Sequence, residues 1–323
     1  MNFAYLNSVK KARGLVLRKL TPEYHLLVYE NIFNSKENKV SKLGVVKHFK
    51  LSYLSKKYPD NEYYHAVFFS QGAIQNGAYF LSLREPQPED ERFKNAALMY
   101  LQMLKSGMEF RGDTILFPYH FDFRRGKNIY RAPWYGGMAQ GQALSAFAIG
   151  YLLTGENEYA RLAESVILSF DRLYGRDEPW FVYIDELGYA WIEEYPDVPP
   201  THVLNGFIYS VFGLYDALMF LPIANEYKVV VDDLISASIR TLLDNLGNYL
   251  SSSNHISPYD STKSSYSVFY HMVHIDQLSV LWQMTGNPKF LEVHHFLKQY
   301  FLKQPLKLRL RNKINDLKSR FLK

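Results

Sequence analysis

Hydrophobic and polar positions follow two different patterns along the chain. Up to about residue 60 the apolar runs are short, as in GLVLRKL (14–20) and YHLLVYE (24–30), which favours a few strands or an irregular arm packed on the main body. From about residue 64 onward the apolar positions recur with a helical period. The change predicts an N-terminal arm over 1–63, partly β, and a helical body over 64–303.

The helical body is predicted to consist of pairs of helices. Breakers such as REPQPED (84–90) separate the two members of a pair. Because inner helices of such pairs can line a bowl that outer helices cover, we expect a mainly α fold, an incomplete (α/α) toroid of about four helical hairpins. The four predicted pairs cover 66–107, 136–175, 201–250 and 266–302.

Two aromatic segments between the helix pairs predict β-hairpins at the cleft of this toroid. Residues 110–135 are rich in turn residues and predict one hairpin, and residues 180–196 predict another around the turn at 186–188. The most apolar window, 203–221, has the length of a membrane span. It contains Asn205 and Asp216 and lacks basic flanks, so we expect a helix buried on all sides.

Composition narrows the function classes. The chain has no cysteine, which excludes disulfides, a thiolate nucleophile and a Cys-based zinc site. Tyrosine is abundant, at 26 residues, and its apolar ring with a hydroxyl suits contacts with sugars as well as an ordinary core. The first twenty residues hold no continuous apolar run and predict no signal peptide, so we expect a protein that is cytoplasmic or peripheral to the inner membrane face.

Positive charge gathers at the C-terminus. The formal net charge is +5, and residues 298–323 hold nine Lys or Arg against one Asp, or +8, which leaves about −3 (5 − 8) for the rest. Residues 304–323 are therefore predicted to form a basic tail. Contact with a membrane surface or a polyanion, and plain solvation, are the open alternatives.

Two adjacent carboxylates and a tyrosine directly precede the apolar window. On a strand, Glu193 and Glu194 point to opposite faces, so at most one of them faces a cleft near Trp191. A carboxyl group among aromatic rings in a partly dry site has a raised pKa, which suits proton abstraction. The alternative is that both are solvated surface charges.

Two further stretches carry candidate polar groups. Tyr270, His274 and Gln277 share one helix face, and Tyr259 lies in the polar loop before them. His271 and His274 resemble a metal pair, but no nearby acid completes a familiar motif, so we predict no metal site. In APWYGGMAQGQAL, Trp134 can stack on a sugar and Gln140 can bond to its hydroxyls, with buried packing as the alternative for both.

Three stretches, in the same order and at similar spacing, resemble the D-glucuronyl C5-epimerase family, specifically its helical C-terminal catalytic domain. The resemblance covers roughly 67–301. These stretches are WYGGMAQGQALSAFAIGYLLTG (134–155), WIEEYPDVPPTHVLNGFIYSVFGLYD (191–216) and YHMVHIDQL (270–278).

The resemblance implies inversion of C5 of D-glucuronate to L-iduronate in a heparosan-like acidic polysaccharide, without a cofactor, a metal or a nucleic-acid partner. Glu194 matches the catalytic glutamate, and Tyr270 the tyrosine on the other sugar face. Tyr259 and Tyr195 match further site tyrosines. A tyrosine acts at neutral pH either as a donor or with its pKa lowered by positive charge, for which Lys263, His271 and His274 are candidates. The family tends to form homodimers.

The sequence departs from the family at one position. The family's Tyr-Asp-Leu-Arg-His-Phe stretch is YDSTKS here, so Thr262 replaces the arginine that would clamp the substrate carboxylate, and Lys263 follows it. Arg124, Arg125 and Arg131 are candidate substitutes. Rival interpretations are a polyuronate lyase, which forms the same C5 anion, and a non-catalytic polyuronate-binding homologue. The residues expected to contact or support the sugar are Trp134, Gln140, Asn205, Lys263, His274 and Arg131.

Overall fold

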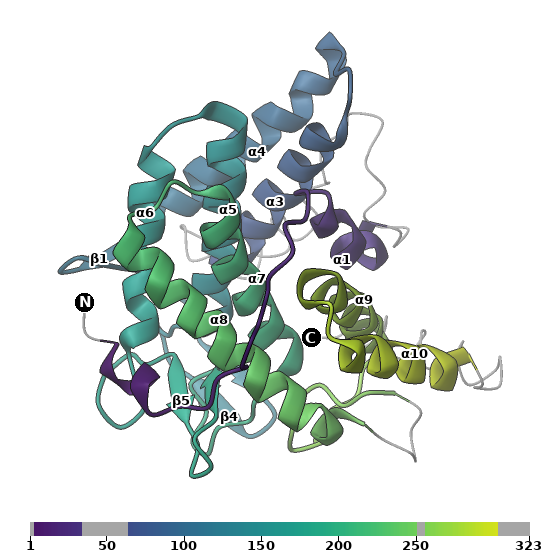
Figure 1. Ribbon diagram of the computed structural model, residues 1–323. Coiled ribbons are helices and arrows are strands. Elements are labelled where there is room, and N and C mark those ends of the chain that lie inside the picture. Colours follow the sequence, from purple (N-terminus) through teal and green to yellow (C-terminus); the bar gives the residue numbers. More distant parts are fainter. Residues whose placement is uncertain (1–2, 34–63, 251–255, 303–323) are drawn as a thin grey trace.

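The computed structural model describes residues 3–33, 64–250 and 256–302, and these form a mainly helical protein (Figure 1). The four predicted helix pairs are confirmed. Short 3₁₀ helices accompany them at Ala4–Asn7, Pro88–Asp90, Leu168–Asp171 and Leu246–Tyr249. The pairs are α3 (Ala66–Ser82) with α4 (Glu91–Ser106), α5 (Gly137–Thr154) with α6 (Glu158–Ile167), α7 (Leu204–Phe220) with α8 (Asn225–Asn245), and α9 (Val268–Thr285) with α10 (Pro288–Leu302).

The first helices of the pairs contact one another in sequence order. Helix α5 packs against α3 and α7, and α7 in turn contacts α9. The second helices, α4, α6, α8 and α10, each pack on the first helix of their own pair. Helix α1 (Tyr24–Phe33) contacts both α9 and α3 (Figure 1).

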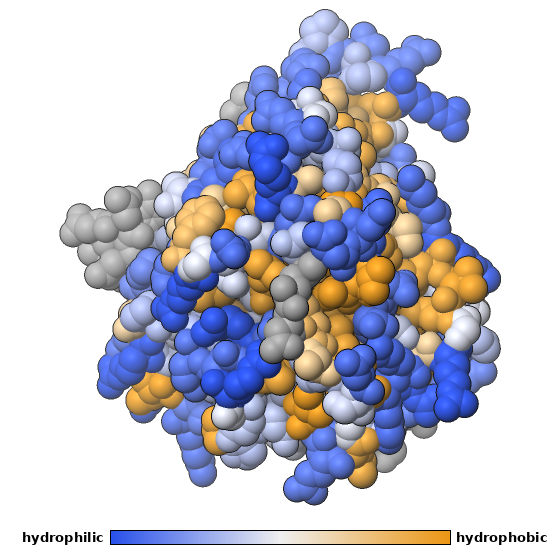
Figure 2. All heavy atoms as spheres, turned by 60° about the vertical axis from the view of Figure 1, so that its left-hand side comes forward, coloured by the Kyte–Doolittle hydropathy of each residue, from blue (hydrophilic) through white to orange (hydrophobic). Residues whose placement is uncertain are grey.

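Helices α5 and α7 form the dry centre of the molecule. Every residue from Gly137 to Gly150 and from Leu204 to Ala217 is buried, as expected for a helix apolar nearly all round. A Cβ atom on Gly213 would lie 1.8 Å from the carbonyl oxygen of Gly141, so this close crossing requires glycine. None of the helices in the described ranges has both the length and the apolar character of a membrane span. On the face in Figure 2, apolar patches are separated by polar residues.

Three antiparallel hairpins supply all the strands of the described chain. The hairpin β5–β6 lies where it was predicted, with Val182 opposite Ile192. Residues 110–135 hold two hairpins and not the single one expected, because left-handed glycines make two tight turns, at Gly112 (φ +61°) and Gly126 (φ +58°). The strands are β1 (Glu109–Arg111), β2 (Thr114–Leu116), β3 (Phe123–Arg125), β4 (Asn128–Tyr130), β5 (Val182–Ile184) and β6 (Ala190–Ile192).

The N-terminal arm differs from the prediction. No strand occurs in residues 3–33, and YHLLVYE forms the start of helix α1. A short apolar run fits either period, and tertiary contacts decide here: the Tyr24 hydroxyl donates to Asp216 Oδ1 (2.7 Å) and His25 Nε2 lies 2.9 Å from Asp216 Oδ2. The rest of the arm (34–63) and the basic tail (304–323) lie outside the described residues, so the division into arm, body and tail stays a prediction.

Candidate active site

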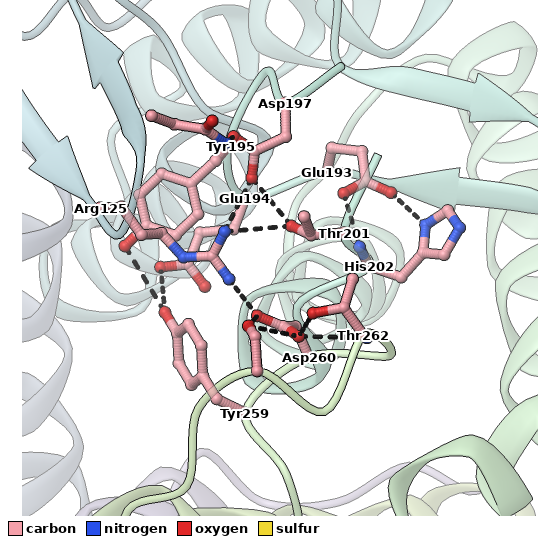
Figure 3. Close-up of polar contacts among 12 residues, drawn as sticks. Arg125, Glu193, Glu194, Tyr195, Asp197, Thr201, His202, Tyr259, Asp260 and Thr262 are labelled. Atoms are coloured by element: carbon pink, nitrogen blue, oxygen red, sulfur yellow. Dashed lines mark hydrogen bonds and ion pairs between the residues drawn. The ribbon is translucent and has the colours of Figure 1, made fainter. Parts of the chain in front are cut away.

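The two adjacent carboxylates, Glu193 and Glu194, directly follow β6. In space, the backbone of Glu193 lies between Phe181, which precedes β5, and the start of α5. The Glu193 N–H donates to the carbonyl of Phe181 (2.9 Å), and the Gly137 N–H donates to the carbonyl of Glu193 (2.7 Å). With the backbone held on both sides, the two side chains diverge. Figure 3 shows Glu193 directed toward His202 and Glu194 toward Tyr259, as the alternation of a strand predicts.

Glu193 is a buried carboxylate with both oxygens bonded. The His202 N–H donates to Oε2 (3.1 Å), and His202 Nδ1 lies 2.5 Å from Oε1. The His202 ring stacks on Trp191 at a centroid distance of 4.0 Å, and the His202 backbone is left-handed (φ +51°). This contact holds the chain entering α7 against β6.

Glu194 has a different environment. Its Oε1 accepts a hydrogen bond from the Tyr259 hydroxyl (3.0 Å), while Oε2 is buried without a hydrogen-bond partner. The carboxylate lies against the first turn of α7 at Gly206, where a Cβ atom would come within 2.3 Å of Oε2. Burial raises the pKa of Glu194 to about 7, against the lowering effects of hydrogen bonds from Tyr195 and Tyr259 and of the Arg125 charge.

Two tyrosines, Tyr195 and Tyr259, adjoin this carboxylate, and a third, Tyr270, packs against Tyr259. The hydroxyls of Tyr195 and Tyr259 are 3.5 Å apart, and the rings of Tyr259 and Tyr270 lie 4.4 Å apart. Burial, followed by the charge of Glu194, raises the pKa of Tyr195 and Tyr259 well above the usual range, so both are protonated donors. The structure therefore brings the side chains of Glu194, Tyr195, Tyr259 and Tyr270 into one cluster, and their catalytic roles stay a prediction.

Arg125 is the one of the three candidate arginines that reaches this cluster. Its guanidinium carbon lies 5.0 Å from the centre of the Tyr195 ring and 5.4 Å from that of Tyr259. Nη1 donates to Asp197 Oδ2 (2.7 Å), and Nη2 is ion-paired with Asp260 (Figure 3). The sequence analysis did not identify Asp197 as a site residue. Its position as an acid directly after Tyr195-Pro196 was the signal that could have identified it.

The comparisons with known proteins identify the family. A family profile described as D-glucuronyl C5-epimerase C-terminus matches residues 111–299, more than half of the chain and the part that carries the cluster. The chain belongs to this family.

One relative and one solved structure give the scale of the likeness. The D-glucuronyl C5-epimerase of Caenorhabditis elegans is 30% identical over 116 residues, which is 34% of this chain and 18% of that protein. The chain thus matches only a minor part of that relative's length. The structure of cellobiose 2-epimerase from Spirochaeta thermophila DSM 6192 aligns with a TM-score of 0.45 and 13% identity, over 93% of this chain and 80% of that one.

The positive charge predicted near the tyrosines does not come from His271 or His274. Burial lowers the pKa of His271 to about 4 and that of His274 to about 3, so both are neutral at pH 7. His274 is fully buried, with Nδ1 2.8 Å from Ser257 Oγ, so it is no sugar contact. Lys263 has an exposed side chain at a loop position with φ +57°. The cation beside the tyrosines is Arg125.

Gln140 and Arg131 also differ from expectation. Gln140 Nε2 donates to the carbonyl of Ile115 (2.8 Å), and its Oε1 accepts from the Phe117 N–H (3.1 Å), so the amide joins α5 to the β2 segment and has no free group for a sugar. Arg131 lies at the surface, with 75% of its side chain exposed, and pairs with Asp122. No group of three or more His, Asp or Glu in the described ranges is arranged to hold a metal ion.

Trp134 and Asn205 lie behind the reactive groups. The Trp134 ring is stacked 6.0 Å from that of Tyr195, and its indole N–H donates to the carbonyl of Phe121 (2.9 Å). Asn205, in the first turn of α7, is buried with its side-chain oxygen lacking a partner. Trp134 therefore packs against Tyr195, and Asn205 directly precedes Gly206, the residue that Glu194 lies against.

Proposed function

We propose that this protein is an epimerase that inverts C5 of D-glucuronate residues to L-iduronate in a heparosan-like acidic polysaccharide, on a fold that is an incomplete (α/α) toroid. The observation that carries the proposal is the state of Glu194. Its carboxyl has a pKa of about 7 and one oxygen without a partner, and it lies among protonated tyrosines. A general base works best when its pKa lies near the operating pH.

The reaction is the removal of a proton from carbon. The C5–H bond lies beside a carboxylate, so its heterolysis places a second negative charge on an enediolate-like anion. In the proposed step Oε2 of Glu194 takes the C5 proton, because this oxygen has no hydrogen bond to give up. Tyr259 keeps its hydrogen bond to Oε1 and holds the carboxylate in place.

Inversion requires a donor on the opposite face of the sugar. We assign this role to Tyr270, whose ring packs against Tyr259 at the start of α9. One C–H bond is broken by Glu194 and another is formed from the tyrosine O–H, so the product is an isomer of the substrate. The Tyr195 and Tyr259 hydroxyls, 3.5 Å apart, offer a path by which the proton on Glu194 returns to the phenolate.

Incubation with a glucuronate polymer in heavy water tests the proposal. Deuterium at C5, with iduronate formed and no new ultraviolet absorption, is the expected result. Absorption from a C4–C5 double bond would instead identify a lyase, in which the same anion expels the C4 substituent. Binding of the polymer without deuterium exchange would identify a non-catalytic homologue. Lys263, exposed in the loop that follows Tyr259, is the proposed contact for neighbouring acidic sugars.

A further inference from the structure

Two consecutive arginines on β3 have opposite environments. Arg124 is exposed, whereas the Arg125 side chain is only 16% exposed and turns toward the tyrosines (Figure 3). This follows from the alternation of side chains along a strand. The two residues are therefore a matched pair for separating a local role from a general effect of positive charge.

Both terminal nitrogens of Arg125 are bonded to the protein itself. Nη1 bonds to Asp197 Oδ2 (2.7 Å) and Thr201 Oγ1 (3.2 Å), and Nη2 bonds to Asp260. Both aspartates are buried, at 2% and 0% exposure. A guanidinium whose two terminal nitrogens each face a carboxylate has these donors engaged within the protein.

The aspartates are themselves held by further donors. Asp197 Oδ1 accepts from Asn128 Nδ2 (2.5 Å) and from the Tyr130 hydroxyl, and Asp197 Oδ2 accepts from Thr201 Oγ1 (2.9 Å). Asp260 Oδ1 accepts from the backbone N–H and the hydroxyl of Thr262, at 3.1 and 2.5 Å. Thr262, which stands where the family has arginine, thus stabilises the aspartate that holds Arg125.

Arg125 in this way joins three segments that are far apart in sequence. The β3–β4 hairpin contributes Arg125, the segment 195–201 contributes Tyr195 and Asp197, and the loop 258–266 contributes Tyr259 and Asp260. The two tyrosines are the ones whose hydroxyls meet beside Glu194. Displacing Arg125 would loosen both tyrosines together.

We infer that Arg125 is a positioning residue, which holds Tyr195 and Tyr259 against Glu194 and does not bind the substrate carboxylate. The kinetic test of this inference depends on the proposed function, whereas a titration of Glu194 does not. An electrostatic consequence accompanies it, because the charge of Arg125 lowers the pKa of Glu194. The titratable or charged groups that act on Glu194 or interact with it are Tyr119, Arg125, Glu193, Tyr195 and Tyr259.

The test compares Arg125→Gln, Arg125→Lys and Arg124→Gln in the full chain, with deuterium exchange into a glucuronate polymer as the assay. For Arg125→Gln we expect kcat to fall about 10- to 100-fold, as for a small misplacement of reacting groups. KM should stay within about twofold, because no substrate contact is removed. The acidic limb of the pH profile should move upward by about half to one pH unit. Arg124→Gln should match the wild type.

Arg125→Lys separates charge from geometry. Lysine keeps the positive charge but cannot bond both aspartates in a fork, so kcat should fall while the acidic limb stays near that of the wild type. A large rise in KM with unchanged kcat in Arg125→Gln would show a substrate clamp and overturn the inference. Equal behaviour of Arg125→Gln and Arg124→Gln would overturn it as well.

A second readout keeps the inference separate from the proposed function. If the wild type exchanges no deuterium, the proposed function fails, and the carboxyl titration of Glu194 followed by carbon-13 NMR still tests Arg125. We expect a higher pKa for Glu194 in Arg125→Gln than in the wild type or Arg124→Gln, and an unchanged pKa would contradict the inference. If Arg125→Gln does not fold, Asp197→Asn, which releases one side of the guanidinium but keeps its charge, replaces it in the kinetic measurement: kcat should then fall without an upward shift of the acidic limb.

Discussion

The segment after β6 carries two glutamates, Glu193 and Glu194, whose side chains point to opposite sides and lie in different environments. Glu193 faces His202, and both of its oxygens are bonded. Glu194 faces the tyrosines, with a hydrogen bond on Oε1 and none on Oε2. Buried polar groups are nearly always bonded, and Glu194 Oε2 combines the lack of a partner with a raised pKa, which together favour this side for handling a proton.

This difference also has a consequence for stability. The folded-state pKa of Glu194, about 7, lies above the ordinary value of 4.5, so the folded chain binds more protons than the unfolded chain between these values. Burying this carboxyl therefore costs free energy progressively as the pH rises from about 4.5 to 7, and the cost stays constant above that range.

Of the substitutions proposed here, Glu194→Gln should have the largest effect on activity. We expect C5 exchange to fall by about a thousandfold or more, because the base is lost. Unfolding at pH 8 should require about 1–3 kcal/mol more free energy than in the wild type, since the buried charge is gone. The gain should disappear near pH 4. Equal stability at pH 8, with Glu186→Gln on the exposed turn as the control, would contradict the raised pKa.

Gly206→Ala tests the space that Glu194 occupies. The new Cβ would lie 2.3 Å from Oε2 and 2.6 Å from the Glu194 Cβ, so the carboxylate must move. We expect exchange to fall by about a hundredfold, with a loss of stability of about 1–3 kcal/mol because the Glu194 Cβ must also shift. Gly213→Ala is the control, because its Cβ would collide with the Gly141 backbone and reduce stability by about 1–3 kcal/mol or more. Normal exchange by Gly206→Ala would place the reactive group elsewhere.

Tyr259→Phe removes the hydrogen bond from the Tyr259 hydroxyl to Glu194 Oε1. Because this bond lowers the Glu194 pKa, its loss should move the acidic limb of the kcat/KM profile upward by about half to one unit. The rate at pH 7 should fall by about tenfold. Tyr189→Phe, which loses a hydroxyl contact with Asp244, serves as the control. A limb that moves downward would show that Tyr259 does not act on Glu194.

Glu193→Gln should have the smallest effect on the chemistry. It leaves one acceptor facing His202 and removes the charge, so we expect a loss of about 1–3 kcal/mol in the free energy of unfolding. Exchange at a temperature where the variant is folded should drop only a few-fold. A loss of exchange as large as in Glu194→Gln would mean that the two carboxylates act together.

Much of the helical body was predictable, because each pair repeats a helical period over more than ten residues and ends at a breaker. The N-terminal arm was not predictable, because the apolar run 24–30 fits both a helical and a strand period. Its contacts with Asp216 are tertiary and leave no local pattern in the sequence. Tyr259 and Tyr270 were found through motif resemblance. Gln140 and His274 were predicted as sugar contacts because the sequence does not show that the Gln140 amide bonds to Ile115 or that His274 is fully buried.

The sequence also could not show which arginine lies beside the tyrosines. Sequence offered three arginines on one aromatic segment, and the choice between them depends on strand register and on two hairpins where one was expected. A shift of one residue along β3 would have turned Arg124 inward. The partner Asp197 lies some seventy positions away, which no local pattern indicates.

The most direct test is a carbon-13 NMR titration of the protein with labelled glutamate carboxyls, in the wild type and in Glu194→Gln. We predict one carboxyl that titrates near pH 7 in the wild type and is missing in the variant. If every glutamate of the wild type titrates below about pH 5, as ordinary carboxyls do, Glu194 is not the poised base and the account is wrong.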